Sequence, residues 1–220
     1  MTISVKICGI SDQESLEVAC EAGADFLGLV FFPKSPRNVS FNSGKILRNL
    51  VPRDSECKVV ALVVNQSDDF IESIVQEINP DFIQIHGDQS VQRVKSLRSR
   101  LAKPIIKAIS VSCEKEVEQG LGYLLPGQIA DIILFDAKPT QSSILPGGNG
   151  LQFDWHILSP VNGKVPFALA GGLNPDNVAE AIRCTGANMV DVSSGVESMP
   201  GKKDHELIRR FIRNAKKSSA

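Results

Sequence analysis

Residues 58–88 read KVVALVVNQSDDFIESIVQEINPDFIQIHGD. The stretch opens with a continuous apolar run, residues 58–64, which is typical of a strand covered on both faces of a parallel sheet. Phe70, Ile74 and Ile78 then recur at intervals of four residues, which predicts an amphipathic helix. A second apolar run, FIQIH, follows at once. This order of strand, helix and strand predicts a βαβ unit with parallel strands.

Apolar runs of the same kind recur along the whole chain, with amphipathic helix candidates between them. They are ISVKIC (3–8), DFLGLVFF (25–32), KVVALVV (58–64), DFIQIH (81–86), PIIKAIS (104–110), DIILFDA (131–137), PFALAGG (166–172) and NMVDVSSG (188–195). Strands alternating with helices favour the α/β class, and eight of them favour a closed (β/α)8 TIM barrel in one domain of residues 1–220. An open doubly wound sheet is the alternative. It has less support because the first strand is not followed by G-x-G-x-x-G or a P-loop.

A weak repeat accompanies this pattern. The segments GADF, NPDF, IADI and GANM each place an Asp or Asn directly before a strand. Helix starts are also visible in the sequence. Ser11 with Glu14 forms a candidate capping box for the first helix, and Asp204 is a candidate N-cap for the last. These signals indicate one structural unit used several times.

Composition excludes several classes of protein. The formal net charge is -1, and the chain has one Trp and one Tyr. Nucleic-acid binding therefore has little support, because it usually needs a basic surface and aromatic side chains that stack on bases. No apolar run approaches the roughly 18 residues of a membrane span, and no secretory signal is evident. The five cysteines are irregularly spaced without C-x-x-C, so we expect neither a disulfide framework nor a zinc site. A soluble protein of the reducing cytoplasm is expected.

Two strand ends carry candidate proton-transfer groups. Catalytic residues of such barrels lie at the carboxyl ends of the strands. Cys8 ends the first run and shares a strand face with Lys6, while Val5 and Ile7 point toward the helices. Asp136 ends the sixth run. A lone cysteine is more often structural, and the carboxylate could instead cap the next loop. An acid and a base on these strands would flank a sugar-sized substrate.

Two loops after the last two strands resemble anion sites. They contain Gly171 and Gly172, and Ser193, Ser194 and Gly195. Glycines let backbone N–H groups approach a ligand closely. Asn174 as N-cap and Pro175 at the first helical position would add a helix N-terminus. A single glycine pair would be only a turn, but two such loops side by side favour a phosphate ligand.

Three further features have two interpretations each. Arg37, in KSPRNVS, could pair with a carboxylate bidentately or be a surface charge. His86 could orient a substrate or form a hydrogen bond within the barrel. The segment Pro146–Gly150, PGGNG, could be a mobile lid or an ordinary loop.

In this order the motifs resemble the phosphoribosylanthranilate isomerase family of tryptophan biosynthesis. The resemblance covers nearly the whole chain. It is carried by KICGI (6–10), SPRNV (35–39), QIHGD (84–88), LFDA (134–137), PGGNGLQFDW (146–155), LAGGLNPDNV (169–178) and DVSSGVESMPGKKD (191–204). One departure is Asn149, where the family usually has Thr or Ser.

The resemblance implies roles for individual residues. Cys8 would be the general base and Asp136 the general acid. Arg37 would hold the anthranilate carboxylate, with His86 and Asp191 facing the substrate. The phosphate would be bound by Gly171, Gly172, Ser194 and Gly195.

The implied reaction is an Amadori rearrangement of an N-linked aminoaldose phosphate to an aminoketose. The substrate's own amine is the electron sink, so no cofactor or metal is implied. An unperturbed thiol is only a few per cent thiolate at neutral pH, so we expect the site to lower the pKa of Cys8.

Two other functions fit the same fold. A Schiff-base aldolase or decarboxylase would use Lys107 or Lys138, which lie near strand ends. A catalytically silent barrel would bind a phosphorylated metabolite as a sensor. Protein partners, oligomeric state and acceptance of a second aminoaldose are left open by the sequence.

Overall fold

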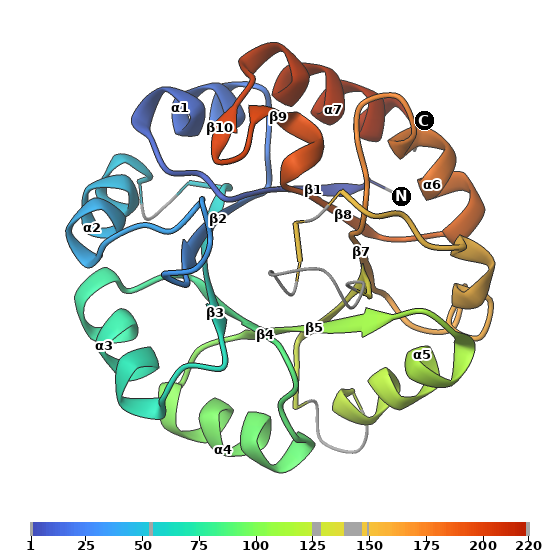
Figure 1. The fold of residues 1–220 in the computed structure, drawn as a ribbon, viewed down its shortest axis with the longest axis horizontal. Helices are drawn as coiled ribbons and strands as arrows, with labels where there is room; N and C mark the ends of the chain where they lie inside the picture. The colour runs from blue at the N-terminus through green and yellow to red at the C-terminus, as the bar shows by residue number, and fades with distance from the viewer. Residues whose placement is uncertain (1, 53–54, 125–128, 139–146, 149, 219–220) are drawn as a thin grey trace.

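The computed structural model describes residues 2–52, 55–124, 129–138, 147–148 and 150–218. Eight parallel strands close into a barrel in chain order, with β8 hydrogen-bonded to β1 (Figure 1). The strands are β1 (Ser4–Cys8), β2 (Phe26–Phe31), β3 (Lys58–Val64), β4 (Phe82–His86), β5 (Ile105–Val111), β6 (Ile132–Ala137), β7 (Ala168–Leu169) and β8 (Met189–Val192). The expected TIM barrel is confirmed.

Helices surround the ring of strands (Figure 1). They are α1 (Gln13–Glu21), α2 (Phe41–Leu50), α3 (Asp68–Ile78), α4 (Val91–Leu101), α5 (Glu114–Gly120), α6 (Val178–Thr185) and α7 (His205–Lys217). Short 3-10 helices are η1 (Leu121–Tyr123), η2 (Trp155–Leu158) and η3 (Ser194–Val196). In the described part of the β6–β7 connection, η2 takes the place of an α-helix.

The strands are apolar throughout because they are buried on both sides. In β3, Val59, Ala61 and Val63 belong to the core between the strands and the helices. Val60 and Leu62 alternate with them and belong to two clusters inside the barrel. Side chains that alternate along a strand point to opposite faces of the sheet. The continuous apolar run in the sequence therefore corresponds to two different hydrophobic environments, one on each face of the strand.

The helix starts agree only in part with the sequence. Asp204 caps α7, since its side chain accepts a hydrogen bond from Leu207 N. The N-cap of α1 is Asp12 and not Ser11, because the Asp12 carboxylate accepts from Ser15 N at 2.8 Å. Spacing alone does not show which of two neighbouring residues with similar capping ability is the N-cap.

The repeated Asp or Asn before a strand has a common structural role. The backbone N–H of each residue donates to a carbonyl at the start of the preceding strand. The residue's side chain accepts from the N–H of that same partner. The pairs are Asp25 with Val5, Asp81 with Val59, Asp131 with Ile105 and Asn188 with Phe167. We call these pairs the strand clamps. They join β1 to β2, β3 to β4, β5 to β6 and β7 to β8 at the amino ends of the strands.

A small antiparallel hairpin follows η3 and was not expected from the sequence. It consists of β9 (Glu197–Met199) and β10 (Lys202–Lys203), with Lys203 paired to Glu197. It lies outside the barrel ring, between η3 and α7 in the chain. Its short strands contain charged residues and one exposed Met199, so they give no apolar signal.

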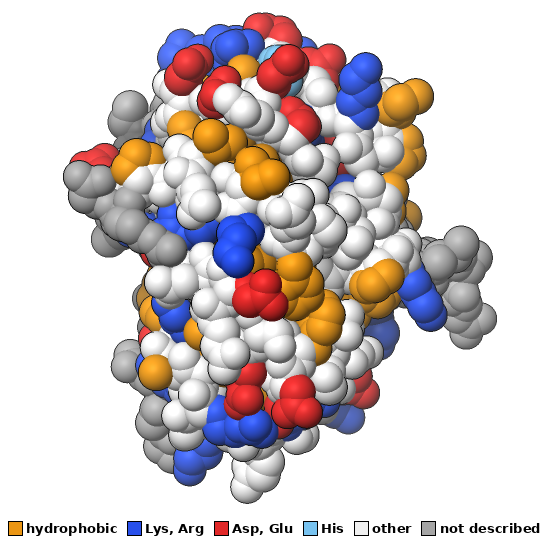
Figure 2. Space-filling view, turned by 90° about the vertical axis from the view of Figure 1, so that its left-hand side faces the viewer, with side chains coloured by type: hydrophobic (Ala, Val, Ile, Leu, Met, Phe, Trp, Pro, Cys, Tyr) orange, Lys and Arg blue, Asp and Glu red, His pale blue; other side chains and the backbone are white. Residues whose placement is uncertain are grey.

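The exterior is mixed in charge. Figure 2 shows acidic and basic side chains interspersed over the face in view, with apolar side chains in small patches between them. This agrees with the formal net charge of -1. Among the helices built from described residues, none has the length and apolar character needed to cross a bilayer.

Candidate active site

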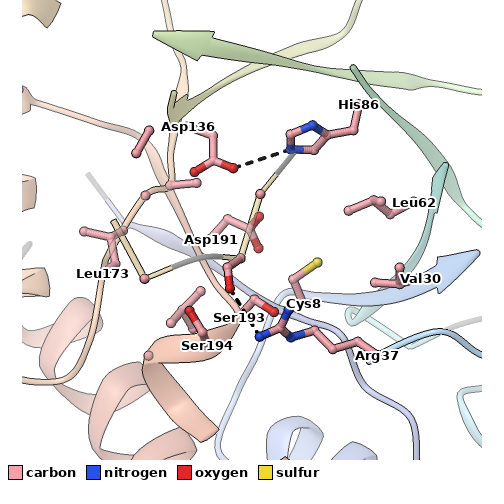
Figure 3. A pocket seen from close by; sticks show the side chains of 18 of the residues that line it. Cys8, Val30, Arg37, Leu62, His86, Asp136, Leu173, Asp191, Ser193 and Ser194 are labelled. Carbon is pink, nitrogen blue, oxygen red and sulfur yellow. Dashed lines mark hydrogen bonds and ion pairs between the residues drawn. The ribbon is translucent and has the colours of Figure 1, made fainter. Parts of the chain in front are cut away.

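A pocket opens at the carboxyl ends of the strands. Cys8, His86 and Asp136 line it from three different strands. Figure 3 shows these side chains around a common space, together with Arg37, Asp191 and the residues of the last two loops.

Cys8 faces the barrel interior, as strand alternation predicts. Its neighbours there are Val30, Leu62 and Val64, which form an apolar wall, and Figure 3 shows Val30 and Leu62 beside Cys8. Gly28 on β2 makes room for the sulfur, because a Cβ at Gly28 would lie 2.8 Å from Sγ. The thiol is thus directed into the pocket rather than outward among the helices.

The expected lowering of the Cys8 pKa is wrong. Burial, the largest influence, raises the pKa of the thiol. Lys6 is the main opposing charge, and Lys203 acts in the same direction, whereas Asp191 adds to the increase. The loss of hydration destabilises the thiolate more than the charges of Lys6 and Lys203 stabilise it. The favoured form of Cys8 at neutral pH is therefore the thiol.

A buried ion pair lies beside Cys8 inside the barrel. Lys6 Nζ donates to Asp191 Oδ1 at 2.9 Å, and the Lys6 side chain has no exposure. Burial opposes the charge on Lys6, but Asp191 and the Cys8 sulfur outweigh it and raise the Lys6 pKa. Asp191 also lines the pocket, where the family resemblance implied that it faces a substrate. A permanent cation is therefore built into the barrel beside the thiol.

Asp136 and His86 meet across the pocket wall. Nε2 of His86 lies 3.4 Å from Oδ2 of Asp136, and both residues are buried (Figure 3). Both sequence interpretations of His86 are thus partly met: it contacts a group inside the barrel and it lines the pocket. Its ring limits the positions open to the Asp136 carboxyl group.

Arg37 makes the expected bidentate contact, but with a carboxylate of the chain itself. Its Nε and Nη2 donate to the two oxygens of Glu197 at 2.7 and 2.8 Å. Glu197 also accepts from Lys203 Nζ at 2.8 Å. Burial raises the pKa of Glu197, but Arg37 and Lys203 outweigh it and hold the value below the usual range. Arg37 lines the pocket, so it is a buried charge rather than a surface one.

The two predicted anion loops are in direct contact. Gly195 packs so closely on the other loop that a Cβ would lie 1.8 Å from Leu173 O. Gly171 has φ +88°, which favours glycine. Within the described part of the chain, the N–H groups of Gly171 and Gly172 donate no hydrogen bond. Together with Ser194, which also lines the pocket, they are suited to an anion.

The helix after the first of these loops begins later than expected. α6 starts at Val178, not at Pro175. Asn174 caps the turn that precedes it, since its Oδ1 accepts from the backbone N–H groups of Asp176 and Asn177. The prediction of Asn174 as the helix N-cap is therefore wrong, since Asn177 is the N-cap of α6 and the side chain of Asn174 stabilises the preceding turn.

Part of the glycine-rich segment covers the pocket. Pro146 and Asn149 lie outside the described residues, so the lid interpretation and the family departure stay predictions. Gly147 and Gly148 line the pocket. A Cβ at Gly147 would lie 2.7 Å from Asp136 Oδ2, and one at Gly148 would lie 2.8 Å from Arg37 Nη1. Backbone without side chains therefore approaches both the carboxyl group of Asp136 and the guanidinium group of Arg37.

The lysines of the Schiff-base alternative do not line the pocket. Lys107 Nζ donates to Gly87 O and Ala108 O and lies over the Tyr123 ring. Burial lowers the pKa of Lys107 to about 8, with Asp88 opposing. Lys138 pairs with Glu116 at the surface. The geometry gives neither amine access to a substrate carbonyl in this pocket.

Sequence reasoning missed several pocket groups. Gln84 is buried and lines the pocket, and its Oε1 accepts no hydrogen bond within the described chain. Its signal was its position two residues before His86 on the same strand face. Glu197 and Lys203 lay inside a matched motif, but the motif does not reveal that they contact Arg37 or Ser193. In the described ranges, no cluster of His, Cys, Asp and Glu has the arrangement of a metal site.

The comparisons with known proteins identify a family. The family model described as N-(5'phosphoribosyl)anthranilate (PRA) isomerase matches residues 5–214. The chain belongs to the PRA isomerase family. The predicted family resemblance is therefore confirmed.

Relatives in the PRA isomerase family match over their full length. The N-(5'-phosphoribosyl)anthranilate isomerase of Parvibaculum lavamentivorans is 44% identical over 220 residues, covering 99% of this chain and 100% of its own. A Rhodopseudomonas palustris counterpart is 46% identical, with 99% and 98% coverage. The PRA isomerase structure from Thermotoga maritima has a TM-score of 0.85 at 36% identity, with 98% and 99% coverage.

One solved PRA isomerase holds a ligand. It contains reduced 1-(o-carboxyphenylamino)-1-deoxyribulose 5-phosphate, with a TM-score of 0.83 at 34% identity, covering 98% of this chain and 99% of that one. That ligand carries a carboxylate on an aromatic ring and a phosphate on a sugar chain. The pocket of the present chain is lined both by the guanidinium group of Arg37 and by the two anion loops.

Proposed function

We propose that Cys8 and Asp136 are the base and the acid of this chain's reaction. The chain is an isomerase of tryptophan biosynthesis that converts N-(5'-phosphoribosyl)anthranilate to 1-(2-carboxyphenylamino)-1-deoxyribulose 5-phosphate. The observation that carries the proposal is that a thiol and a carboxyl group from β1 and β6 line one pocket beside an anion loop.

The substrate is held at three places. The anthranilate ring packs against the apolar wall of Val30, Leu62 and Val64, with its carboxylate at Arg37. The phosphate accepts hydrogen bonds from the loops after β7 and β8, at Gly171, Gly172, Ser194 and Gly195. His86 and Asp191 face the sugar between these ends. The three contacts fix the ribose carbons between the acid and the base.

The first chemical step opens the ribose ring. Asp136, in its protonated form, gives its proton to the furanose ring oxygen while the C1–O bond breaks. The nitrogen lone pair forms the C=N bond of an iminium ion, so the substrate remains the electron sink. His86, 3.4 Å from Asp136, orients the carboxyl group toward the ring oxygen.

The second step moves a proton from C2 of the sugar. Cys8 as thiolate takes this proton, and the electrons of the C–H bond form the enolamine while the iminium is neutralised. Tautomerisation then gives the ketone. Lys6 stabilises the thiolate, because its ammonium lies beside the sulfur and its charge lowers the thiol pKa against the effect of burial.

We place the protein in the cytoplasm, acting as one domain over residues 1–220 on a phosphorylated small molecule. No cofactor, metal or nucleic acid takes part in the reaction as written. Protein partners are not part of the proposal.

A direct assay tests the assigned roles. The purified protein is mixed with N-(5'-phosphoribosyl)anthranilate, and loss of anthranilate-type fluorescence reports turnover. Cys8→Ser and Asp136→Asn should each lower kcat by about 10²–10⁴-fold, the range for a lost acid or base. Exposed Cys113→Ser and Asp154→Asn are the matched controls and should retain parental kcat.

Either variant retaining parental kcat would remove that residue from the mechanism. A parent that binds the substrate without turnover would favour the sensor alternative. Thermal unfolding of each variant should follow the parent, which separates a lost catalytic group from a lost fold.

A further inference from the structure

The side chain of Arg37 is fixed before any substrate arrives. Glu197 occupies Nε and Nη2, and Gly148 O accepts from Nη2 at 3.3 Å. A guanidinium has five N–H donors, and the remaining two are on Nη1. Within the described residues, Nη1 makes no hydrogen bond, and Figure 3 shows the guanidinium group beneath Cys8 at the edge of the pocket.

The carboxylate that holds Arg37 is itself held from two sides. Glu197 Oε1 accepts from Lys203 Nζ at 2.8 Å, and Oε2 accepts from Gly201 N at 3.2 Å. The side chains of Glu197 and Lys203 are 3% and 0% exposed, so neither moves freely in solvent. Lys203 Nζ also donates to Ser193 O at 3.0 Å. One network therefore joins Arg37 to the start of the anion loop after β8.

The apolar part of Arg37 is fixed as well. Its Cδ would lie 2.6 Å from a Cβ at Gly9, so the arginine stem occupies the space left by that missing side chain. Gly9 has φ +78° and directly follows Cys8. The close approach fixes the stem of Arg37 directly against the end of β1. Both ends of the Arg37 side chain are thus constrained by groups outside its own loop.

We propose that Glu197 and Lys203 are positioning residues that hold Arg37 with Nη1 toward the pocket and thereby select ligands carrying an aromatic carboxylate. The inference rests on the proposed function, which places a carboxylated aromatic ring at Arg37. A long side chain that is already ordered loses little rotamer freedom on binding, so more of the ion-pair energy appears as affinity.

The charges of the network set its selectivity. Arg37 and Lys203 are cationic and Glu197 is anionic, so the three groups carry a net charge of +1. One carboxylate from a ligand neutralises this charge. A ligand whose aromatic ring lacks the carboxylate leaves Nη1 of Arg37 desolvated and without a hydrogen-bond partner. The network therefore discriminates by the presence of the carboxylate and not by the sugar phosphate.

Two stable ligands separate these effects. One is reduced 1-(o-carboxyphenylamino)-1-deoxyribulose 5-phosphate, and the other is the same compound without its carboxyl group. Calorimetry of the parent and of Glu197→Gln gives a Kd for each. We expect Glu197→Gln to weaken the carboxylated ligand about 10- to 100-fold, the scale of a charge-assisted contact. The carboxyl-free ligand should change by less than about threefold.

A double-mutant cycle tests that Glu197 acts through Arg37. Once Arg37→Met has removed the guanidinium, adding Glu197→Gln should cause no further loss of affinity for the carboxylated ligand. Glu118→Gln, at an exposed glutamate of α5, is the matched control and should leave both Kd values unchanged. Should Glu197→Gln fail to fold, Glu197→Asp supplies the comparison, because it keeps the charge but withdraws it from Arg37.

Equal weakening of both ligands, or none of either, would overturn the inference, since a purely structural role does not distinguish them. Failure of the proposed function gives a different result. A parent that binds both ligands but does not isomerise N-(5'-phosphoribosyl)anthranilate removes the isomerase assignment, while the ratio of the two Kd values still decides the role of Glu197.

Discussion

At the scale of single residues, the buried thiol determines the working pH. Because burial raises the pKa of Cys8, the thiolate fraction continues to increase at pH values above those where an exposed cysteine has ionised. The charged groups that face the sulfur are Lys6 and Asp191 inside the barrel and Lys203 from the hairpin. The base is therefore a minor species at neutral pH.

We predict that kcat/KM rises with pH through the alkaline range. The rate of Cys8 alkylation by iodoacetamide, followed by mass spectrometry at each pH, should rise over the same range. Exposed Cys113 is an internal control that shows the reagent to be active at each pH. An alkylation rate for Cys8 that levels off below the ordinary thiol value of 9.0 would contradict the raised pKa.

The sequence predicts which residues face the pocket better than it predicts their chemistry. Strand alternation placed Cys8 and Lys6 on the interior face, and the structure confirms this. The direction of the Cys8 pKa shift was wrong, because burial and the charge of Asp191 come from strands distant in sequence. For Arg37 the bidentate geometry was predicted, but its partner Glu197 was not, since it lies 160 positions away.

At the scale of elements, the strand clamps hold pairs of strands together at the end of the barrel opposite the pocket. In the clamp of Asp81, the backbone N–H donates to Val59 O and Oδ2 accepts from Val59 N, both at 2.8 Å. Arg48 adds an ion pair at 3.4 Å. The clamp thus stabilises the β3–β4 unit without contacting the pocket.

Asp81→Ala should lower the free energy of unfolding by about 1–3 kcal/mol, since it leaves a buried N–H without its acceptor. Urea unfolding measures this loss, and kcat and KM should remain at parental values. Asp69→Ala, at an exposed aspartate of α3, is the matched control and should change stability little. Altered KM in Asp81→Ala would mean that the two ends of the barrel are coupled.

The repeated Asp or Asn was visible in the sequence, but its function was not. Spacing placed one such residue before β2, β4, β6 and β8, which is correct. Its hydrogen-bond partner is at the start of the preceding strand, and only the closed βαβ geometry brings the two together. The β9–β10 hairpin was missed for another reason: Glu197 and Lys203 form a buried ion pair between its strands, and neither strand contains an apolar run.

At the scale of the whole molecule, acid should destabilise the fold through carboxylates that are paired with cations. Partial burial opposes the ionisation of Asp131, but Arg98 and Ile105 N–H outweigh it and lower its pKa. The pKa of Glu197 is lowered in the same way by Arg37 and Lys203. A group with a lowered folded-state pKa stabilises the fold above its unfolded value and loses this effect as the pH falls through the folded value.

We predict that the free energy of unfolding decreases as the pH falls below the ordinary Glu value of 4.5. Urea unfolding at several pH values between neutral and acidic conditions measures this dependence. The stability difference between the parent and Glu197→Gln should narrow as the pH falls, because acid protonates the same carboxylate that the substitution removes. A difference that stays constant with pH would show that Glu197 contributes no ionised-state stability.

The strand clamps divide the barrel into four consecutive units of two strands. In each unit, one clamp joins the two strands at their amino ends. Chain breaks that fall between units, as in the connection from β2 to β3, leave every clamp inside a continuous segment. A break inside a unit separates the two halves of one clamp. Circularly permuted forms of this chain should therefore fold best when their new termini lie after an even-numbered strand and before the next odd-numbered strand. Two complementary fragments of the chain should also reassemble most readily when the chain is divided at one of these boundaries.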